Sequence, residues 1–238
     1  MIPSHLIKLT GDHPAMSTSP ANAMSRTQTV VLATNRVLRN TYMLLSMTLL
    51  FSALTAWVSM ALNLPHPGLV LTLGGYFGLL FLTAKFRRRN LGIAFVFALT
   101  GFMGYTLGPI LNAYLAMANG AQTVMMAMGG TAAIFFSLST YVRATGKNFN
   151  FMGGFLVTGI LVAFLAGLGA IFFEMPALSL AVSSMFVMLM AGLILYETSN
   201  IIHGGETNYI MATVTLYVAI LNLFTSLLHL LGFMNGDD

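Results

Sequence analysis

Long apolar runs separated by short polar breaks dominate the chain. Seven runs each approach or exceed the roughly 20 residues that a helix needs to cross a bilayer. The breaks between them are rich in Pro, Gly, Asn or basic residues, which end helices. The pattern predicts seven membrane-spanning helices, at residues 41–62, 67–84, 91–111, 121–142, 151–172, 177–199 and 209–233.

The first 40 residues follow a different pattern. They are rich in Ser, Thr, Pro and Ala and contain no apolar run long enough for the core of a signal peptide. A segment of such low hydrophobicity cannot bury a core. We therefore expect residues 1–40 to form a polar, largely disordered tail, residues 41–233 the transmembrane domain, and residues 234–238 a short second tail.

The composition agrees with a membrane protein. Of 238 residues, 57% are hydrophobic and 7% are charged, whereas about 25% are charged in a typical soluble domain. With a mean hydropathy of +0.85, too few polar side chains remain to cover a globular surface in water. The sequence contains no cysteine, which excludes disulfides, thiolate metal sites and a Cys nucleophile. The fold class predicted is an all-α polytopic membrane protein.

The charges predict the orientation of the chain. If the first tail is cytoplasmic and seven spans alternate, all ten Lys and Arg residues fall in cytoplasmic segments. The charged residues in the opposite segments are then only the acidic Glu174, Asp237 and Asp238. The positive-inside rule therefore predicts a cytoplasmic amino terminus and a periplasmic carboxyl terminus. The same distribution accounts for a pI near 9.6 without a nucleic-acid partner.

Small and hydroxyl-bearing residues indicate where helices pack. Glycine pairs at 74 and 78, 104 and 108, and 154 and 159 have the spacing that brings membrane helices close together. Four hydroxyl-bearing residues on one face of the first helix favour interhelical hydrogen bonds over a solute path. These four are Thr48, Ser52, Thr55 and Ser59.

The candidate chemistry is sparse. The sequence has no HExxH, no Gly-x-Ser-x-Gly and no phosphate-binding loop, so we predict no catalytic residue and no cofactor. His203 and Glu206 allow a metal site, but a Gly-rich turn accounts for the same residues, and no metal site is predicted. Asn222, in the middle of the last span, either hydrogen-bonds within the bundle or coordinates an ion.

Glu197 is the exceptional ionisable residue. It follows about 20 apolar or small residues near the inner end of the sixth span. A carboxylate at such depth faces a cavity or a partner, or reaches headgroup water, and the sequence leaves both open. Because three arginines at 87–89 lie at a similar expected depth, we predict an ion pair, direct or through water, between Glu197 and Arg87 or a neighbour.

Three strings carry a family resemblance: NRVLRNTYMLLSMTL, GFMGYTLGPILNAYL and LYETSNIIHGGETNYI. Over about Thr34 to Phe233 the chain resembles the bacterial branch of the transmembrane BAX inhibitor motif family. The resemblance implies a seven-helix bundle in the bacterial inner membrane, and the sparse candidate chemistry predicts no enzymatic activity. It also implies association with the membrane AAA protease FtsH and its HflK/HflC partners, as both a substrate and a modulator.

The implied protease partner gives the first tail a role. A protease that pulls on its substrate must begin where the chain is loose, and the polar segment offers such a start. We therefore expect the tail marked by Met1, Thr18 and Ser25 to engage the protease. A slowly extracted substrate would then inhibit the protease by competition.

The wider family supplies an alternative, a pH-sensitive calcium or cation leak channel. In those relatives two aspartates on the sixth and seventh helices share a proton-sensitive site, and an arginine ending the second helix acts as a latch. The resemblance places Glu197 at the first acidic position and Arg87 at the latch. Asn222 is retained, but Ala219 replaces the second aspartate. This departure removes the like-charge coupling of the shared site and counts against a channel gated at Glu197.

Overall fold

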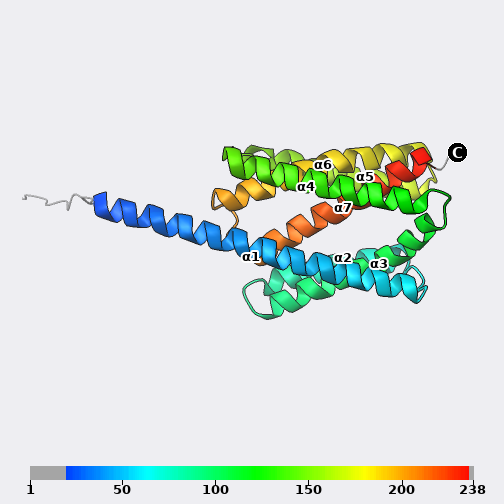
Figure 1. Ribbon diagram of the computed structural model, residues 1–238, viewed down its shortest axis with the longest axis horizontal. Helices are drawn as coiled ribbons and strands as arrows, with labels where there is room; N and C mark the ends of the chain where they lie inside the picture. The colour runs from blue at the N-terminus through cyan, green and yellow to red at the C-terminus, as the bar shows by residue number, and fades with distance from the viewer. Residues whose placement is uncertain (1–19, 236–238) are drawn as a thin grey trace, which may run out of the picture.

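The computed structural model describes residues 20–235, and these residues are almost entirely helical (Figure 1). Seven of the described helices are long and apolar enough to cross a membrane, which confirms the predicted all-α polytopic fold. A single 3₁₀ turn, η1, leads into the fifth of them. The elements are α1 (Pro20–Ala61), α2 (Leu69–Phe86), α3 (Leu91–Leu115), α4 (Gly120–Thr145), η1 (Asn150–Met152), α5 (Gly153–Phe172), α6 (Pro176–Ile202) and α7 (Tyr209–Asn235).

The beginning of α1 differs from the expected tail. The helix starts at Pro20 and its membrane-spanning part at Thr34, so residues 20–40 are helical rather than disordered. Proline fits the first turn of a helix, and a segment continuous with a spanning helix needs no nucleus of its own. Of the three residues expected to engage the protease, Ser25 lies in α1, and the structure describes its backbone but not its side chain. Met1 and Thr18 lie outside the described residues.

The ends of the later helices follow local residue chemistry. Gly146 ends α4 with φ of 62°, a left-handed conformation that favours glycine. Pro176 occupies the first turn of α6, where its missing N–H costs no helical hydrogen bond. The side-chain oxygen of Asn208 accepts hydrogen bonds from the backbone N–H groups of Ile210 and Met211, which caps α7.

Helix α7 forms the centre of the bundle. Figure 1 shows it running between one group made of α1, α2 and α3 and another made of α4, α5 and α6. It packs against α6, α4 and α1, whereas α2 packs mainly on α3 and α5 mainly on α6. Leu216, Tyr217 and Leu223 of α7 are completely buried. The principal core therefore surrounds α7.

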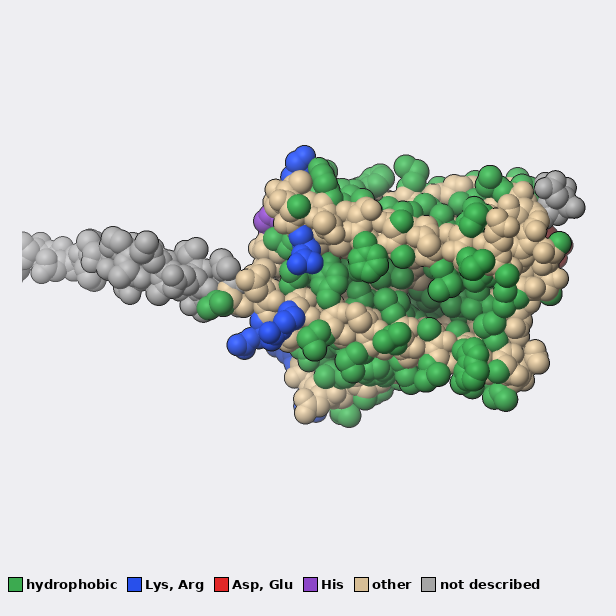
Figure 2. All heavy atoms as spheres, in the orientation of Figure 1, with side chains coloured by type: hydrophobic (Ala, Val, Ile, Leu, Met, Phe, Trp, Pro, Cys, Tyr) green, Lys and Arg blue, Asp and Glu red, His purple; other side chains and the backbone are tan. Residues whose placement is uncertain are grey.

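The outer surface is strongly apolar. Leu50, Val70 and Phe172 are 72%, 86% and 74% exposed, which suits contact with lipid chains rather than water. Hydrophobic side chains lie across the visible face between the two ends of the bundle, and the Lys and Arg side chains gather at the end where α1 enters (Figure 2). We call this end the basic end.

The glycine pairs have different outcomes. A side chain at Gly104 would collide with the Ser52 carbonyl, and one at Gly108 would lie 2.5 Å from the Ser59 side chain. The predicted close approach is therefore confirmed between α1 and α3. The prediction of a close helix contact is wrong for Gly74 and Gly78, because a Cβ added at either position would have no atom within 4 Å. In the last pair, only the glycine at 159 is crowded, by a leucine of α6.

The hydroxyl face of α1 points into the bundle. The Ser52 hydroxyl pairs with that of Tyr217 on α7, and the Ser59 hydroxyl donates to the Tyr105 carbonyl on α3 at 3.0 Å. The predicted interhelical hydrogen bonds are confirmed at these two positions. The hydroxyls of Thr48 and Thr55 instead donate to carbonyls of their own helix, at 2.9 Å in both cases.

Candidate functional site

The polar residues that could carry function concentrate at the basic end. All eight basic side chains between residues 34 and 235 lie near the start of the membrane-spanning part of α1, in the last turn of α2 or α4, or in the turn that follows each of these two helices. Figure 2 shows those on the visible face clustered around the entry of α1. Glu174, in the α5–α6 turn, marks the opposite end. The eight residues are Arg36, Arg39, Lys85, Arg87, Arg88, Arg89, Arg143 and Lys147.

Glu197 is buried near the end of α6 that faces this cluster. Only 4% of its surface is exposed, and its Oε1 atom has no hydrogen-bond partner in the described part of the chain. Arg87 lies in the α2–α3 turn with its side chain exposed. The structure contains no direct ion pair between the two groups. An arginine at a turn keeps its strongly polar head in water, which opposes its insertion beside a buried acid.

Asn222 lies deeper in the bundle, on α7. Its side-chain nitrogen donates to the Val218 carbonyl of the same helix at 2.8 Å. It also borders a cavity of about 500 Å³ whose other walls include Tyr76 of α2, Phe164 of α5 and Phe186 of α6. Thus Glu197 and Asn222 lie on the packed pair α6 and α7, whereas Arg87 is on a separate turn. No described contact joins the three predicted residues.

The turn between α6 and α7 is tied to the α4–α5 turn. The Ser199 hydroxyl accepts a hydrogen bond from the Phe149 N–H at 2.8 Å. The Nδ1 atom of His203 lies 2.8 Å from the Ser199 carbonyl oxygen, and its Nε2 atom lies 3.2 Å from the Gly146 carbonyl oxygen. The histidine considered for a metal site therefore bridges two turns of the backbone.

The same turn is tied to the α2–α3 turn, and the first part of α7 is tied to α1. The Glu206 carboxylate accepts a hydrogen bond from the Asn208 N–H at 2.6 Å, and the Asn208 side-chain nitrogen donates to the Arg87 carbonyl at 2.9 Å. The Thr213 hydroxyl lies 3.3 Å from the Thr41 carbonyl of α1. Among the described residues, no group of three or more His, Asp or Glu side chains gathers at a point. Ser199, His203 and Asn208 thus hold three loops together at the basic end.

Comparison with known proteins decides the family. The sequence profile described as "Inhibitor of apoptosis-promoting Bax1" matches residues 34–236, most of the chain. This chain belongs to the BAX inhibitor family. The match begins at Thr34, where the membrane-spanning part of α1 begins.

Relatives within the family are similar over nearly their full length. The "Modulator of FtsH protease YccA" of Escherichia coli strain K12 is 54% identical over 213 residues, which are 90% of this chain and 97% of the relative. The "Inner membrane protein YccA" of E. coli O6:H1 has the same identity and coverage. An uncharacterized protein of Pseudomonas aeruginosa is 52% identical over 202 residues, 85% of this chain and 91% of the relative. This BAX inhibitor family member is a multi-pass inner-membrane protein.

Two features of this family member were missed from the sequence. The first is Asn208, which caps α7 and anchors the α2–α3 turn through Arg87. An Asn directly before an apolar run is an N-cap signal, so the capping of α7 could have been predicted from the sequence. The contact with Arg87 could not. The second is a pocket between Tyr42 of α1 and Arg143 of α4. No sequence signal indicates that these two helices face each other.

Proposed function

We propose that this protein is a membrane-embedded modulator of the FtsH protease that inhibits it by competing as a slowly degraded substrate. The observation that carries the proposal is the 54% identity, over 97% of its length, to the E. coli protein named as a modulator of that protease. The family resemblance adds HflK and HflC as members of the same assembly. We infer that the protein acts by contact and not by catalysis, since Ser199, His203 and Asn208 at the basic end hold helices and turns together.

The packing of the bundle supports slow degradation. Extraction of α7 must break its contacts with α6, α4 and α1 together, since all three pack on it. The hydroxyls that join α1 to α7 and α3 add hydrogen bonds that must break inside the membrane. A protease that starts on this chain therefore remains occupied during the extraction.

Helix α1 supports engagement at the first end of the chain. Figure 1 shows α1 projecting well beyond the other helices at the basic end. The 14 residues from Pro20 to Ala33 precede the membrane-spanning segment and are about 21 Å long at 1.5 Å per residue. We propose that this projection, with the polar residues before it, is the part that the protease grips.

The gathering of basic residues supports an orientation. We propose that the basic end is cytoplasmic, since Lys and Arg are retained on that side of bacterial membranes. The α5–α6 turn, with Glu174, and the end of α7 would then face the periplasm. This orientation places the projecting part of α1 in the compartment of an ATP-driven protease.

The calcium-leak alternative is not favoured. A site shared between α6 and α7 needs two carboxylates, and Ala219 is completely buried in the α7 core at the position of the second. The side chain of Asn222 also donates a hydrogen bond to a carbonyl of its own helix. An experiment in liposomes distinguishes the two functions. Calcium release that is faster than from protein-free vesicles and is abolished by Glu197→Gln would favour the channel.

Affinity purification tests the proposed partner directly. The full chain, tagged at its carboxyl end and purified from native membranes in a mild detergent, should bring down FtsH together with HflK and HflC. A matched bait is the same chain with Gly104→Ala and Gly108→Ala, which crowd the contact between α1 and α3. Recovery of the intact chain alone, under conditions that preserve a known FtsH complex, would contradict the proposal.

A further inference from the structure

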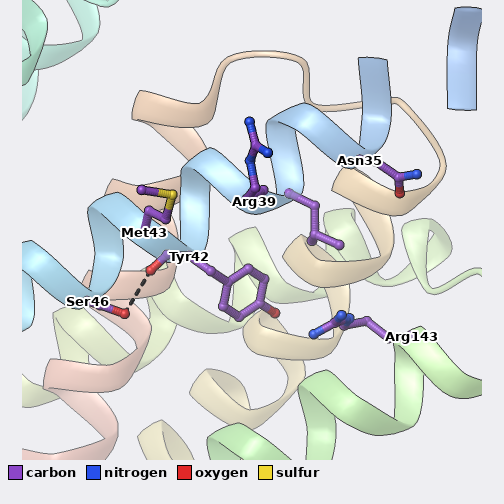
Figure 3. Close-up of a pocket in the computed structure, with 7 residues that line it drawn as sticks. Asn35, Arg39, Tyr42, Met43, Ser46 and Arg143 are labelled. Atoms are coloured by element: carbon purple, nitrogen blue, oxygen red, sulfur yellow. Dashed lines mark hydrogen bonds between the residues drawn. The ribbon is translucent and has the colours of Figure 1, made fainter. Parts of the chain in front are cut away.

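A pocket of about 470 Å³ lies between α1 and α4 at the basic end. Arg39 and Tyr42 line it from α1, and Arg143 lines it from α4. Figure 3 shows the Tyr42 ring projecting from α1 with its hydroxyl toward the guanidinium of Arg143, while Arg39 stands on the rim and points outward. The Arg143 guanidinium lies 5.9 Å from the centre of the Tyr42 ring. The pocket therefore combines two cationic groups with one phenol.

The phenol of the pocket lacks a hydrogen-bond partner. The Tyr42 hydroxyl oxygen is buried and has no partner in the described part of the chain. Neither Arg39 nor Arg143 forms an ion pair with a described carboxylate. Buried donors without acceptors cost free energy, so a ligand that offers acceptor oxygens is stabilised here.

An apolar stripe continues from the pocket along α1. Met43 lines the pocket, and Met47, Leu50 and Leu54 follow it at helical spacing on the same face. All four side chains are at least 55% exposed. The bound molecule can therefore have an anionic end at the pocket and an apolar body along α1.

We propose that this pocket binds the phosphate of an anionic phospholipid. Arg143 and Arg39 donate charge-assisted hydrogen bonds to the phosphate oxygens, the guanidinium being well matched to phosphate geometry. Tyr42 donates its free hydroxyl. The exposed Arg39 side chain closes over the headgroup from the rim, and the acyl chains lie along Met43 and the stripe that follows it.

The position of the pocket favours a lipid over a soluble anion. It lies at the edge of the apolar surface of the bundle, where the headgroups of one leaflet lie. The apolar stripe stabilises acyl chains, and a free phosphate gains nothing from it. A zwitterionic headgroup carries an ammonium group that two guanidiniums repel, so the anionic lipid is preferred.

Native mass spectrometry of the full chain in detergent, with phosphatidylglycerol and phosphatidylcholine added in equal amounts, tests the proposal. The intact protein should retain phosphatidylglycerol preferentially. Arg39→Gln with Arg143→Gln should weaken that binding about tenfold or more, since two charge-assisted hydrogen bonds are lost. Lys85→Gln with Arg88→Gln is the matched control. It removes the same charge from the same end without touching the pocket, and should keep the preference.

Two results would overturn the proposal. One is equal retention of phosphatidylglycerol by the intact protein and the Arg39, Arg143 double variant. The other is displacement of the lipid by inorganic phosphate at comparable concentration, which would make the pocket a site for a soluble anion. Tyr42→Phe keeps both charges and the packing against Phe135, so it serves if the double variant does not fold. It should weaken phosphatidylglycerol binding about threefold, and unchanged binding would count against the site.

Discussion

The hydroxyl groups of Ser52 on α1 and Tyr217 on α7 lie 2.7 Å apart in the middle of the bundle. The Tyr217 hydroxyl also lies 3.3 Å from the Thr100 carbonyl on α3. Tyr217 is completely buried, so one phenol joins three helices in the interior of the bundle. This contact connects the central helix to the group formed by α1, α2 and α3.

Removing this hydroxyl should destabilise the bundle modestly. Tyr217→Phe deletes the hydrogen bonds and keeps the ring, so we expect a loss of about 1 kcal/mol. For a chain of this size, that loss lowers the melting temperature in detergent by roughly 2–4 °C. Tyr141→Phe, at an exposed tyrosine on α4, is the control and should leave the melting temperature unchanged. An equal shift in both variants would show that the buried contact adds nothing.

Two glycines with the same sequence signal should respond differently to alanine. Gly104→Ala forces a methyl group against the Ser52 carbonyl, and overpacking of this kind costs about 1–3 kcal/mol. Gly78→Ala meets no atom within 4 Å and removes the helix penalty of glycine, so its stability should be unchanged or higher. Thermal unfolding of both variants in the same detergent provides the measurement. Similar losses in the two variants would contradict the α1–α3 contact.

The proposed orientation makes a prediction for reporter fusions. Alkaline phosphatase, which is active only outside the cytoplasm, should be inactive when fused after Arg88. It should be active when fused after Ala118 or Asn235, because those positions lie at the opposite end of the spans. A fluorescent protein that matures only in the cytoplasm should give the reverse pattern. Activity after Arg88 would invert the topology and remove the projecting part of α1 from the cytoplasm.

Deletion of residues 2–25 should slow degradation of the protein by FtsH. The deletion ends before Thr34, where the membrane-spanning part of α1 begins, so the bundle should stay folded and bound to the protease. The stalled variant should also inhibit degradation of other membrane substrates more strongly than the full chain. A Gly/Ser segment of equal length in place of residues 2–25 should restore turnover. If the truncated protein disappears as fast as the intact one, the protease grips elsewhere.

Much of the fold could be predicted from the pattern of apolar runs, since each spanning helix must hydrogen-bond its backbone N–H and C=O groups within itself. Spacing alone was less informative about partners. Gly104 lies at a close helix contact and Gly78 does not, although both belong to pairs of the same spacing. What separates them is the helix that each faces, which only the tertiary structure provides.

The candidate site was predicted less completely. The sequence left open whether Glu197 is buried or reaches headgroup water, and in the structure it is buried. No direct ion pair joins it to Arg87. Equal depth in the membrane does not place two groups side by side. The pocket between Arg39 and Arg143 depends on α1 and α4 facing each other across 104 residues of sequence, for which no local pattern exists.

We propose that this protein inhibits FtsH by occupying it. This inhibition is measured as the degradation rate of a labelled membrane substrate by purified FtsH in liposomes, with increasing amounts of the full chain in the same bilayer. Degradation of the labelled substrate should slow as the chain is added, and the chain itself should be consumed more slowly than the substrate. The rate should recover once the chain is exhausted. An unchanged rate at all amounts, with the chain present and folded in the bilayer, would show that the protein does not inhibit FtsH by occupying it.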